Sequence, residues 1–404
     1  MKEEQLMAIL RKEIEIPDVV AEKADQALDQ IRREMREQEP MTFSGRRAKG
    51  SGKKYAVLAA AAALAAGTVS VYAAYSSWSR GMQEELHVSE EQQRKLEENG
   101  MTSLAASAAV DAGVTITAQQ SITDHYYSYL AFQVEGYQLE EGETPAFENI
   151  TVTVDGETEV SWGGHFYDGI VDGEEGTLAY GDGTSLDTDS DGVLIPRYVG
   201  EDGSMEYHIV LAKSMERGFF TGKRVQVEFE NLGTVTKDSY QPDIQGRWLL
   251  EMELGGADTS RLINTKETLG DTDAVVTSVE LSPVSIRVLY DFPRKLLTEE
   301  FEDEDGRLQS YTYSAEPPMA VGVRLKDGTC LAPLYGGPGT QGYLDTSSEQ
   351  YVLAYAFAQV IDPDQVAAIL FEKLEEDGGT GYENLQGDET TSYEEPDYYE
   401  IAVK

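Results

Sequence analysis

The feature that most constrains this chain is an uncharged run that directly follows a cluster of positive charges. Five basic residues lie in "RRAKGSGKK" (46–54), and no charged residue occurs in the 24 residues from Tyr55 to Trp78. A helix of that length rises about 36 Å, enough to cross a hydrocarbon core of about 30 Å. Aromatic residues at both ends suit the membrane interface. The pattern predicts one transmembrane helix at 55–78.

Two other interpretations of this run remain open. Ten of its 24 residues are Ala and only five are Leu or Val, which also fits an alanine-rich soluble helix. "SVYAA" has the small residues of a signal-peptide cleavage site, although 54 residues precede the run and a signal has only a short basic region before it. A soluble helix would leave the charge asymmetry of the chain unexplained.

The charge distribution predicts the orientation of the span. Before Tyr55 there are 12 Lys and Arg against 11 Asp and Glu, and after it 20 against 63. The residues that determine topology under the positive-inside rule are Arg46, Arg47, Lys49, Lys53 and Lys54. We therefore expect a single-pass protein of the cell membrane with a cytoplasmic amino terminus and an extracellular carboxyl terminus. The strongly acidic exterior argues against nucleic acid as a partner, because phosphates would repel it.

The cysteine content adds a constraint on the exterior. The chain contains a single cysteine, Cys330, so the exterior folds without an intramolecular disulfide. A disulfide-free ectodomain of this size indicates a bacterial protein. We expect the thiol to be buried and inert.

Residues 1–45 predict a short helical cytoplasmic head, which a Gly/Ser/basic tether (46–54) joins to the span. A helical stripe of apolar residues runs along the second helix, after a break at Pro17. Two short helices cannot bury their stripes fully against each other, which leaves apolar surface for a partner, for self-association or for the membrane surface. The candidate partner-binding residues are Leu6, Ile9, Leu10, Val20, Ala24, Leu28, Ile31 and Met35.

The exterior predicts a mainly β ectodomain of two small antiparallel β-sandwich domains, at 113–260 and 261–376. Runs such as "YYSYLAFQVEGY" and "RVQVEFENLG" are rich in β-branched and aromatic residues, and Asp-Gly, which favours hairpin turns, occurs nine times between Asp155 and Gly378. A juxtamembrane helical linker is predicted at 79–112, with a helix at about 90–99 that Ser89 and Gln92 cap. The acidic tail, 377–404, is expected to be largely disordered, although "DYYEIAVK" can add a strand.

Motifs of catalysis and metal binding are scarce. Asp187, Asp189 and Asp191 in "DTDSDG" match the first half of a calcium loop, but Tyr198 stands where the bidentate acid is expected, so a solvated turn is favoured over calcium. The four histidines (87, 125, 165 and 208) are scattered without metal-ligand spacing, and no nucleophile elbow or phosphate loop occurs. "SWGGHFYDG" is read as packing aromatics in preference to a sugar platform. We expect no enzyme activity, cofactor or metal.

The succession of segments resembles a known family. "EIPDVVAEKADQALDQIRRE", a basic flank, one span and then "GMQEELHVSEEQQRKLEENGMTSLAASAAVDAGVTITAQQSITDHYYSYLAFQVEGY" resemble single-pass, anti-sigma-factor-like membrane proteins of Gram-positive bacteria, whose ectodomain begins with a domain of uncharacterised function. "SVELSPVSIRVLYDF" and "FAQVIDPDQVAAILFEKL" are similar to the end of that ectodomain. The resemblance implies a regulator whose head sequesters an extracytoplasmic-function sigma factor while the exterior senses envelope state through an unknown extracellular ligand. The head has no His or Cys, so its contact with a sigma factor would be apolar and metal-free, unlike that of zinc-binding anti-sigma heads.

The second hypothesis is a cell-envelope scaffold or adhesion protein, in which the head is a stub and the β-sandwiches bind wall polymer or protein. The apolar stripe of the head favours the regulator, because a stub has no use for it. A sigma-factor gene beside this one would discriminate the two.

Overall fold

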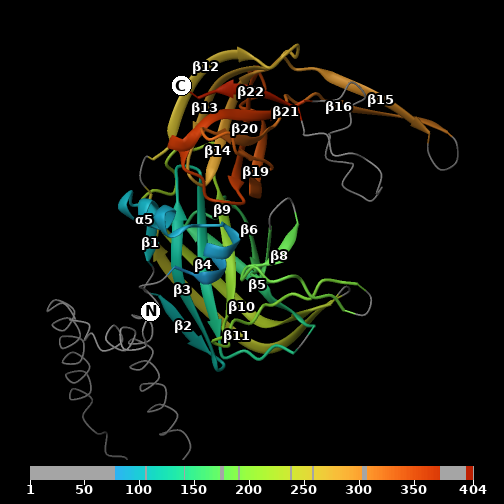
Figure 1. Cartoon of the computed structure of the whole chain (residues 1–404). Helices are drawn as coiled ribbons and strands as arrows, with labels where there is room; N and C mark the ends of the chain where they lie inside the picture. Colours follow the sequence, from blue (N-terminus) through green and yellow to red (C-terminus); the bar gives the residue numbers. More distant parts are fainter. Residues whose placement is uncertain are drawn as a thin grey trace, which may run out of the picture. The chain divides into compact units, whose positions relative to one another are not determined.

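The computed structural model describes residues 78–104, 107–140, 142–172, 177–189, 192–236, 239–256, 259–302, 307–373 and 397–403. The predicted head, the tether and all but the last residue of the predicted span therefore lie outside the described residues. Within the described ranges, no helix is long and apolar enough to cross a membrane. These ranges are mainly β, in antiparallel sheets, as the sequence predicts (Figure 1). Their α-helices are α4 (Arg80–Glu85) and α5 (Glu90–Glu98).

The earlier strands form two facing sheets. The larger has the order β1-β3-β4-β9-β6, with β2 also paired to β3, and the smaller has the order β11-β10-β5. The strands of the larger sheet are β1 (Thr102–Leu104), β2 (Ala108–Asp111), β3 (Val114–Thr123), β4 (Tyr127–Glu135), β6 (Ser161–Phe166) and β9 (Met205–Ala212). Those of the smaller sheet are β5 (Thr144–Val154), β10 (Arg224–Val235) and β11 (Tyr240–Glu253).

Alternating apolar residues build the core between these two sheets. Leu130 and Phe132 of β4 meet Val227 and Phe229 of β10, because side chains two apart on a strand share a face. Trp248 is fully buried there and donates from Nε1 to the carbonyl of Val114 at 3.1 Å. The indole therefore fills the core without leaving its N–H unpaired.

The opposite face of the larger sheet is buried as well. Tyr127 and Tyr129 of β4 pack in a second cluster with Met82 and Leu86 around α4 and with Val284 from the later part of the chain. Both faces of β4 are thus covered, and six consecutive residues of the strand are buried. This explains why "YSYLAF" shows no apolar–polar alternation.

The later strands enclose a separate core. One sheet has the order β12-β13-β14-β20-β19, the other β18-β17-β21-β22. The strands of the first are β12 (Arg261–Thr268), β13 (Val275–Leu281), β14 (Ser285–Asp291), β19 (Tyr335–Tyr343) and β20 (Gln350–Phe357). Those of the second are β17 (Ala320–Leu325), β18 (Cys330–Leu331), β21 (Val366–Glu372) and β22 (Tyr398–Ala402). The residues of this core all follow residue 260 and those of the first core all precede it.

Two hairpins and a 3₁₀ turn complete the described chain. Strands β7 (Ile170–Asp172) and β8 (Leu178–Tyr180) pair beside the larger sheet, and the 3₁₀ turn η2 (Pro363–Gln365) precedes β21. Strands β15 (Leu296–Glu302) and β16 (Leu308–Ser314) form a hairpin that extends away from the other strands in Figure 1.

Several local expectations can be compared with the structure. The capped helix predicted at about 90–99 is confirmed as α5, with the reciprocal Ser89–Gln92 capping box. The rest of the predicted helical linker is wrong after Met101, because β1 and β2 pair with β3 there. The end of the acidic tail is ordered as β22, whose Ile401 is buried, so the strand alternative holds for those residues.

The expectation of a buried cysteine is wrong. Cys330 is exposed because it lies on β18, a two-residue strand at the edge of its sheet.

A buried carboxylate joins the two sets of sheets. Asp124, in the β3–β4 turn, is 2% exposed, and its Oδ1 accepts the backbone N–H groups of Tyr126 and Tyr127 at 2.8 Å each. Its Oδ2 accepts the hydroxyls of Ser282, in the β13–β14 turn, and of Ser285, the first residue of β14, at 2.5 Å each. All four donors are satisfied by one side chain, which fixes one turn against the other.

Asp124→Asn should weaken this junction. The amide NH₂ cannot accept from the serine hydroxyls, and Ser282 Oγ already accepts from the backbone N–H of Ser285 at 2.9 Å. We expect the free energy of unfolding, measured by urea denaturation, to fall by about 2 kcal/mol. The matched control is Asp327→Asn, an exposed turn residue whose Oδ1 accepts the N–H of Thr329 and which an amide can replace. Equal stability of the two variants would contradict this role of Asp124.

Candidate functional site

The site begins with two histidines that strand pairing brings together. Strands β6 and β9 are antiparallel neighbours, and their register places His165 directly opposite His208. Paired residues project from the same face of a sheet, and their neighbours Phe166 and Tyr207 project into the first core. Both imidazoles therefore lie on the outer face of the sheet, the face that α4 covers.

Helix α4 supplies the carboxylate. Ser79 caps its start, accepting the N–H of Met82 at 3.2 Å, and Met82 and Leu86 are buried. This docking places Glu85, the last residue of α4, against both histidines. Its Oε2 lies 2.5 Å from Nδ1 of His208, and its Oε1 lies 3.3 Å from Nε2 of His165. We call Glu85, His165 and His208 the Glu–His–His cluster.

A second carboxylate supports the cluster from behind. Glu206, two residues before His208 on β9, places Oε2 at 3.3 Å from Nε2 of His208. The same oxygen accepts the N–H of Gly81 at 3.0 Å and the hydroxyl of Ser79. Glu206 thus holds the start of α4 and the inner nitrogen of His208 together.

The close approach of α4 to the sheet requires a glycine. A Cβ on Gly81 would lie 2.7 Å from the Tyr167 ring and 2.8 Å from Oε2 of Glu206. The Tyr167 ring stacks on His208, with centroids 5.6 Å apart, and its hydroxyl donates to Glu84 at 2.7 Å. Burial, and then the hydrogen bond to Glu84, raise the pKa of Tyr167, so it remains a neutral donor.

Electrostatics favour the charged forms of His208, Glu85 and Glu206. Burial alone would lower the pKa of His208, but hydrogen bonds to Glu206 and Glu85 outweigh it and raise the pKa to about 9. Burial would raise the pKa of Glu85, but the two histidines lower it well below its usual value. The pKa of Glu206 is lowered in the same way, with His208 as the main opposing cause. At neutral pH His208 is therefore an imidazolium between two carboxylates.

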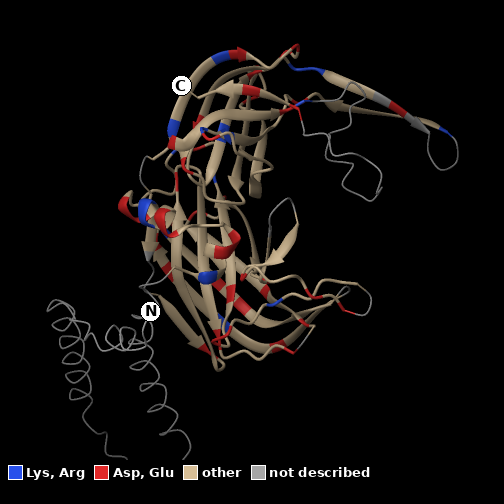
Figure 2. Ribbon diagram, in the orientation of Figure 1, with Lys and Arg blue, Asp and Glu red and all other residues tan. Residues whose placement is uncertain are grey.

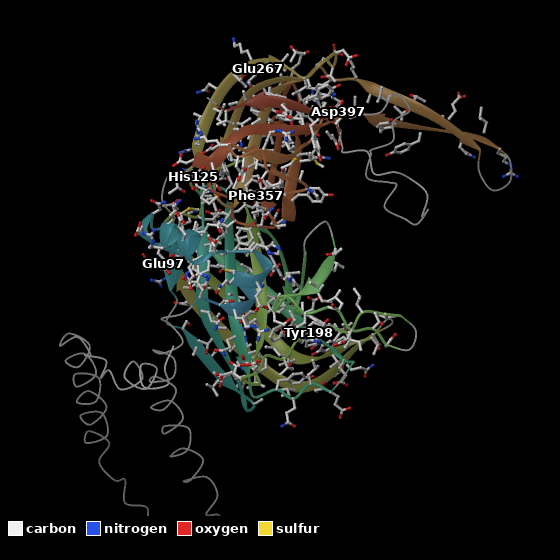
Figure 3. The ribbon with its side chains drawn as sticks, in the orientation of Figure 1. Glu97, His125, Tyr198, Glu267, Phe357 and Asp397 are labelled. Carbon is white, nitrogen blue, oxygen red and sulfur yellow. The ribbon has the colours of Figure 1, made fainter. Side chains whose placement is uncertain are left out.

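The cluster forms part of the wall of a cleft. A cleft of about 510 Å³ lies between β6 and the start of β19, and we call it the β6/β19 cleft. Glu85 and His165 line it together with Trp162 and Tyr335. Phe357, labelled in Figure 3, contributes from β20. The His165 side chain is 54% exposed and that of His208 4%, so the cluster opens toward the cleft through His165.

The residues predicted from sequence fall elsewhere. All candidate partner-binding residues of the head and all topology residues lie outside the described residues, as does Asp191. The Asp187 carboxylate pairs with Arg197 at 2.9 Å, and Oδ1 of Asp189 accepts the N–H of Val193 at 2.9 Å. Both carboxylates thus have roles within a turn. The stretch "SWGGHFYDG" divides between the core (Phe166) and the cleft (Trp162).

The Glu–His–His cluster is the site that the sequence spacing did not reveal. His165 and His208 are on different strands, and Glu85 is 123 residues before His208. The available signal was the pair of strand-like runs around "GGHF" and "EYHIV", each with a histidine at an outward position. Only the pairing of β6 with β9, which sequence alone did not predict, brings them together.

Comparisons with known proteins add little to this geometry. No protein-family model matches the chain, and no curated protein matches it. Among solved structures, the crystal structure of the conserved domain protein from Bacillus anthracis matches with a TM-score of 0.34 and 13% identity, covering 69% of this chain and 82% of that chain. A likeness at this TM-score carries no argument about fold or function.

The charge of His208 should give stability a defined pH dependence. The pKa of His208 is about 9 in the folded protein and about 6.5 in the unfolded chain. The ion pairs of His208 therefore stabilise the fold fully below about pH 6.5, and this stabilisation is lost as the pH rises through about 9. With a metal chelator in the buffer, the His208→Gln variant should have a free energy of unfolding on the order of 3 kcal/mol lower than the wild type near neutral pH. The difference from the wild type should narrow as pH rises to about 10.

The control for the loss of an imidazole is His87→Gln, an exposed histidine outside the cluster. Urea denaturation of all three proteins across this pH range measures the effect. A difference between wild type and His208→Gln that stays constant with pH would show that His208 does not act through its charge.

Proposed function

We propose that this chain is a membrane-anchored regulator whose helical head (1–45) sequesters an extracytoplasmic-function sigma factor while the β unit senses the envelope outside. The observation that carries the proposal is the order of the segments: a basic cluster, the uncharged run 55–78, and at once a folded β unit that begins at α4. A net-acidic exterior agrees with it. Figure 2 shows Lys and Arg scattered among Asp and Glu over the described ribbon.

The β unit has an arrangement suited to a sensor. Helix α4 is the first element after the proposed span, and its last residue, Glu85, lines the β6/β19 cleft. A ligand in the cleft would contact Glu85 and His165 directly, and both hold α4 to the sheet. Occupancy of the cleft would therefore change the forces on the segment that enters the membrane.

One observation favours the alternative of an envelope scaffold or adhesion protein. Three large side chains of the β15–β16 hairpin are exposed to solvent. Leu296 is 73% exposed, Leu308 65% and Tyr311 60%. Such side chains on an extended hairpin are typical of contact surfaces. In this alternative the head is a stub and the exterior does the binding.

The topology can be tested through the single cysteine. Because Cys330 is exposed, a membrane-impermeant maleimide should label it in intact, wall-stripped cells. In the control, Cys330→Ser combined with Ser44→Cys, the new thiol is in the head and should be labelled only after permeabilisation. Labelling of Cys330 only after permeabilisation would refute the proposed orientation.

The head can be tested through its apolar stripe. Leu28→Asp with Ile31→Asp places two charges where an apolar contact is proposed, and the lost burial alone is worth about 1.5–3 kcal/mol per side chain. We expect sigma-factor binding to weaken more than tenfold, measured by co-purification with the full-length chain. The regulon of that sigma factor should rise as in a gene deletion.

The matched control adds the same charge on the polar face of the predicted helix, as Gln26→Asp with Gln30→Asp. It should leave binding unchanged while both variants accumulate in the membrane. If no sigma factor co-purifies with the wild type and no regulon responds to deletion, the scaffold alternative replaces this one.

A further inference from the structure

The Glu–His–His cluster presents metal-ligand atoms at metal-ligand distances. One ligand atom from each of Glu85, His165 and His208 lies within 4.8 Å of the others. Oε1 of Glu85 and Nε2 of His165 are 3.3 Å apart. Two ligands that are each about 2.1 Å from a tetrahedral ion are separated by about 3.4 Å. Oε1 of Glu85 and Nε2 of His165 therefore already have the spacing of two ligands of one metal ion.

The types of ligand narrow the choice of ion. Two imidazole nitrogens and one carboxylate oxygen suit zinc and its first-row neighbours, which bind nitrogen well. Calcium and magnesium prefer shells made entirely of oxygen, and the three residues offer one carboxylate. The nitrogen-rich set thus points away from the ions that an acidic protein surface usually attracts.

The surroundings of His208 match the outer shell of a metal site. A metal-binding histidine commonly gives its second nitrogen to a carboxylate, which fixes the ring. His208 presents Nδ1 to the cluster, and its Nε2 faces Oε2 of Glu206 at 3.3 Å. Glu206 is itself held by the N–H of Gly81 and the hydroxyl of Ser79. The ring therefore cannot turn without disturbing α4.

The cluster is also accessible on one side. His165 and Glu85 line the β6/β19 cleft, while His208 lies behind them. An ion would enter from the cleft and keep a coordination position directed into it, where water or a donor atom of a larger ligand can bind.

We propose that Glu85, His165 and His208 bind one divalent transition-metal ion of the zinc class, with Glu206 as the outer-shell partner of His208. The ion takes the place of the Nδ1 proton of His208, which is released to solvent, and Nε2 keeps its proton toward Glu206. It replaces the direct contact between Glu85 and His208 and links the end of α4 to β6 and β9. The proposal is independent of the sigma factor and of the membrane span, because all of its residues belong to the described β unit.

The test is a titration of the purified full-length chain, stripped of metal by a chelator, with ZnCl₂ in a calorimeter. We expect one equivalent to bind with a Kd of about 10 μM or tighter, and about millimolar Mg²⁺ not to compete. Co²⁺ should give the visible absorption of a tetrahedral nitrogen–oxygen site.

Variants then assign the ligands. His165→Ala changes an exposed side chain, so it should fold normally and weaken Zn²⁺ binding at least tenfold. Glu206→Gln should weaken binding by about tenfold while the stoichiometry stays at one. His87→Ala, which removes an exposed histidine outside the cluster, should leave the affinity unchanged.

Absence of binding at about millimolar zinc would overturn the proposal. So would an affinity that His165→Ala leaves unchanged, because the ion would then be bound elsewhere. Neither result would affect the topology or head experiments, so failure here is distinguishable from failure of the proposed regulator.

Discussion

The buried Asp124 carboxylate is the interaction on which the arrangement of the β unit depends. A charged side chain is expensive to bury unless its hydrogen bonds are complete, and Asp124 completes them with donors from two turns that are 158 residues apart. Beside it, the Tyr129 hydroxyl donates to the carbonyl of Phe357 at 2.7 Å, and the Tyr126 hydroxyl donates to Glu280 at 2.7 Å. These directional bonds join the β3–β4 turn and β4 to β13 and β20, the sheet that also contains β19 and so one wall of the β6/β19 cleft.

The contact between the two sets of sheets also explains why charged side chains gather at the Glu–His–His cluster. The central strands of the larger sheet, β3, β4 and β9, are buried on both faces, since one side packs on β10 and β11 and the other on α4, α5 and the later strands. Polar residues on the second side must therefore find partners within the protein. His208 and Glu206 do so by binding Glu85, Ser79 and Gly81 of the α4 segment. The same covering that stabilises the sheet concentrates charged groups beside the cleft.

The sequence predicted the local elements better than the site. Runs such as "YSYLAFQV" and "VAAILFE" became β4 and β21, and Ser89 with Gln92 capped α5, because these signals act between near neighbours. The short strands β1 and β2 were missed because their propensity is weak and β3 imposes their pairing. The Glu–His–His cluster was also missed because contacts between residues distant in the sequence form it. His165, His208 and Glu85 meet only through strand register and the docking of α4, which no local pattern encodes.

Helix α4 is the element through which these features act on one another. Six residues are too few for a helix to be stable by itself in water, so its order depends on its contacts. Those contacts are the buried Met82 and Leu86, the glycine that permits close approach, and Glu85 in the cluster. A change at the cleft that removed only the Glu85 contacts would leave α4 attached by its apolar side chains and by Glu206. A graded change in α4, without unfolding of the sheets, is therefore the response that this arrangement allows.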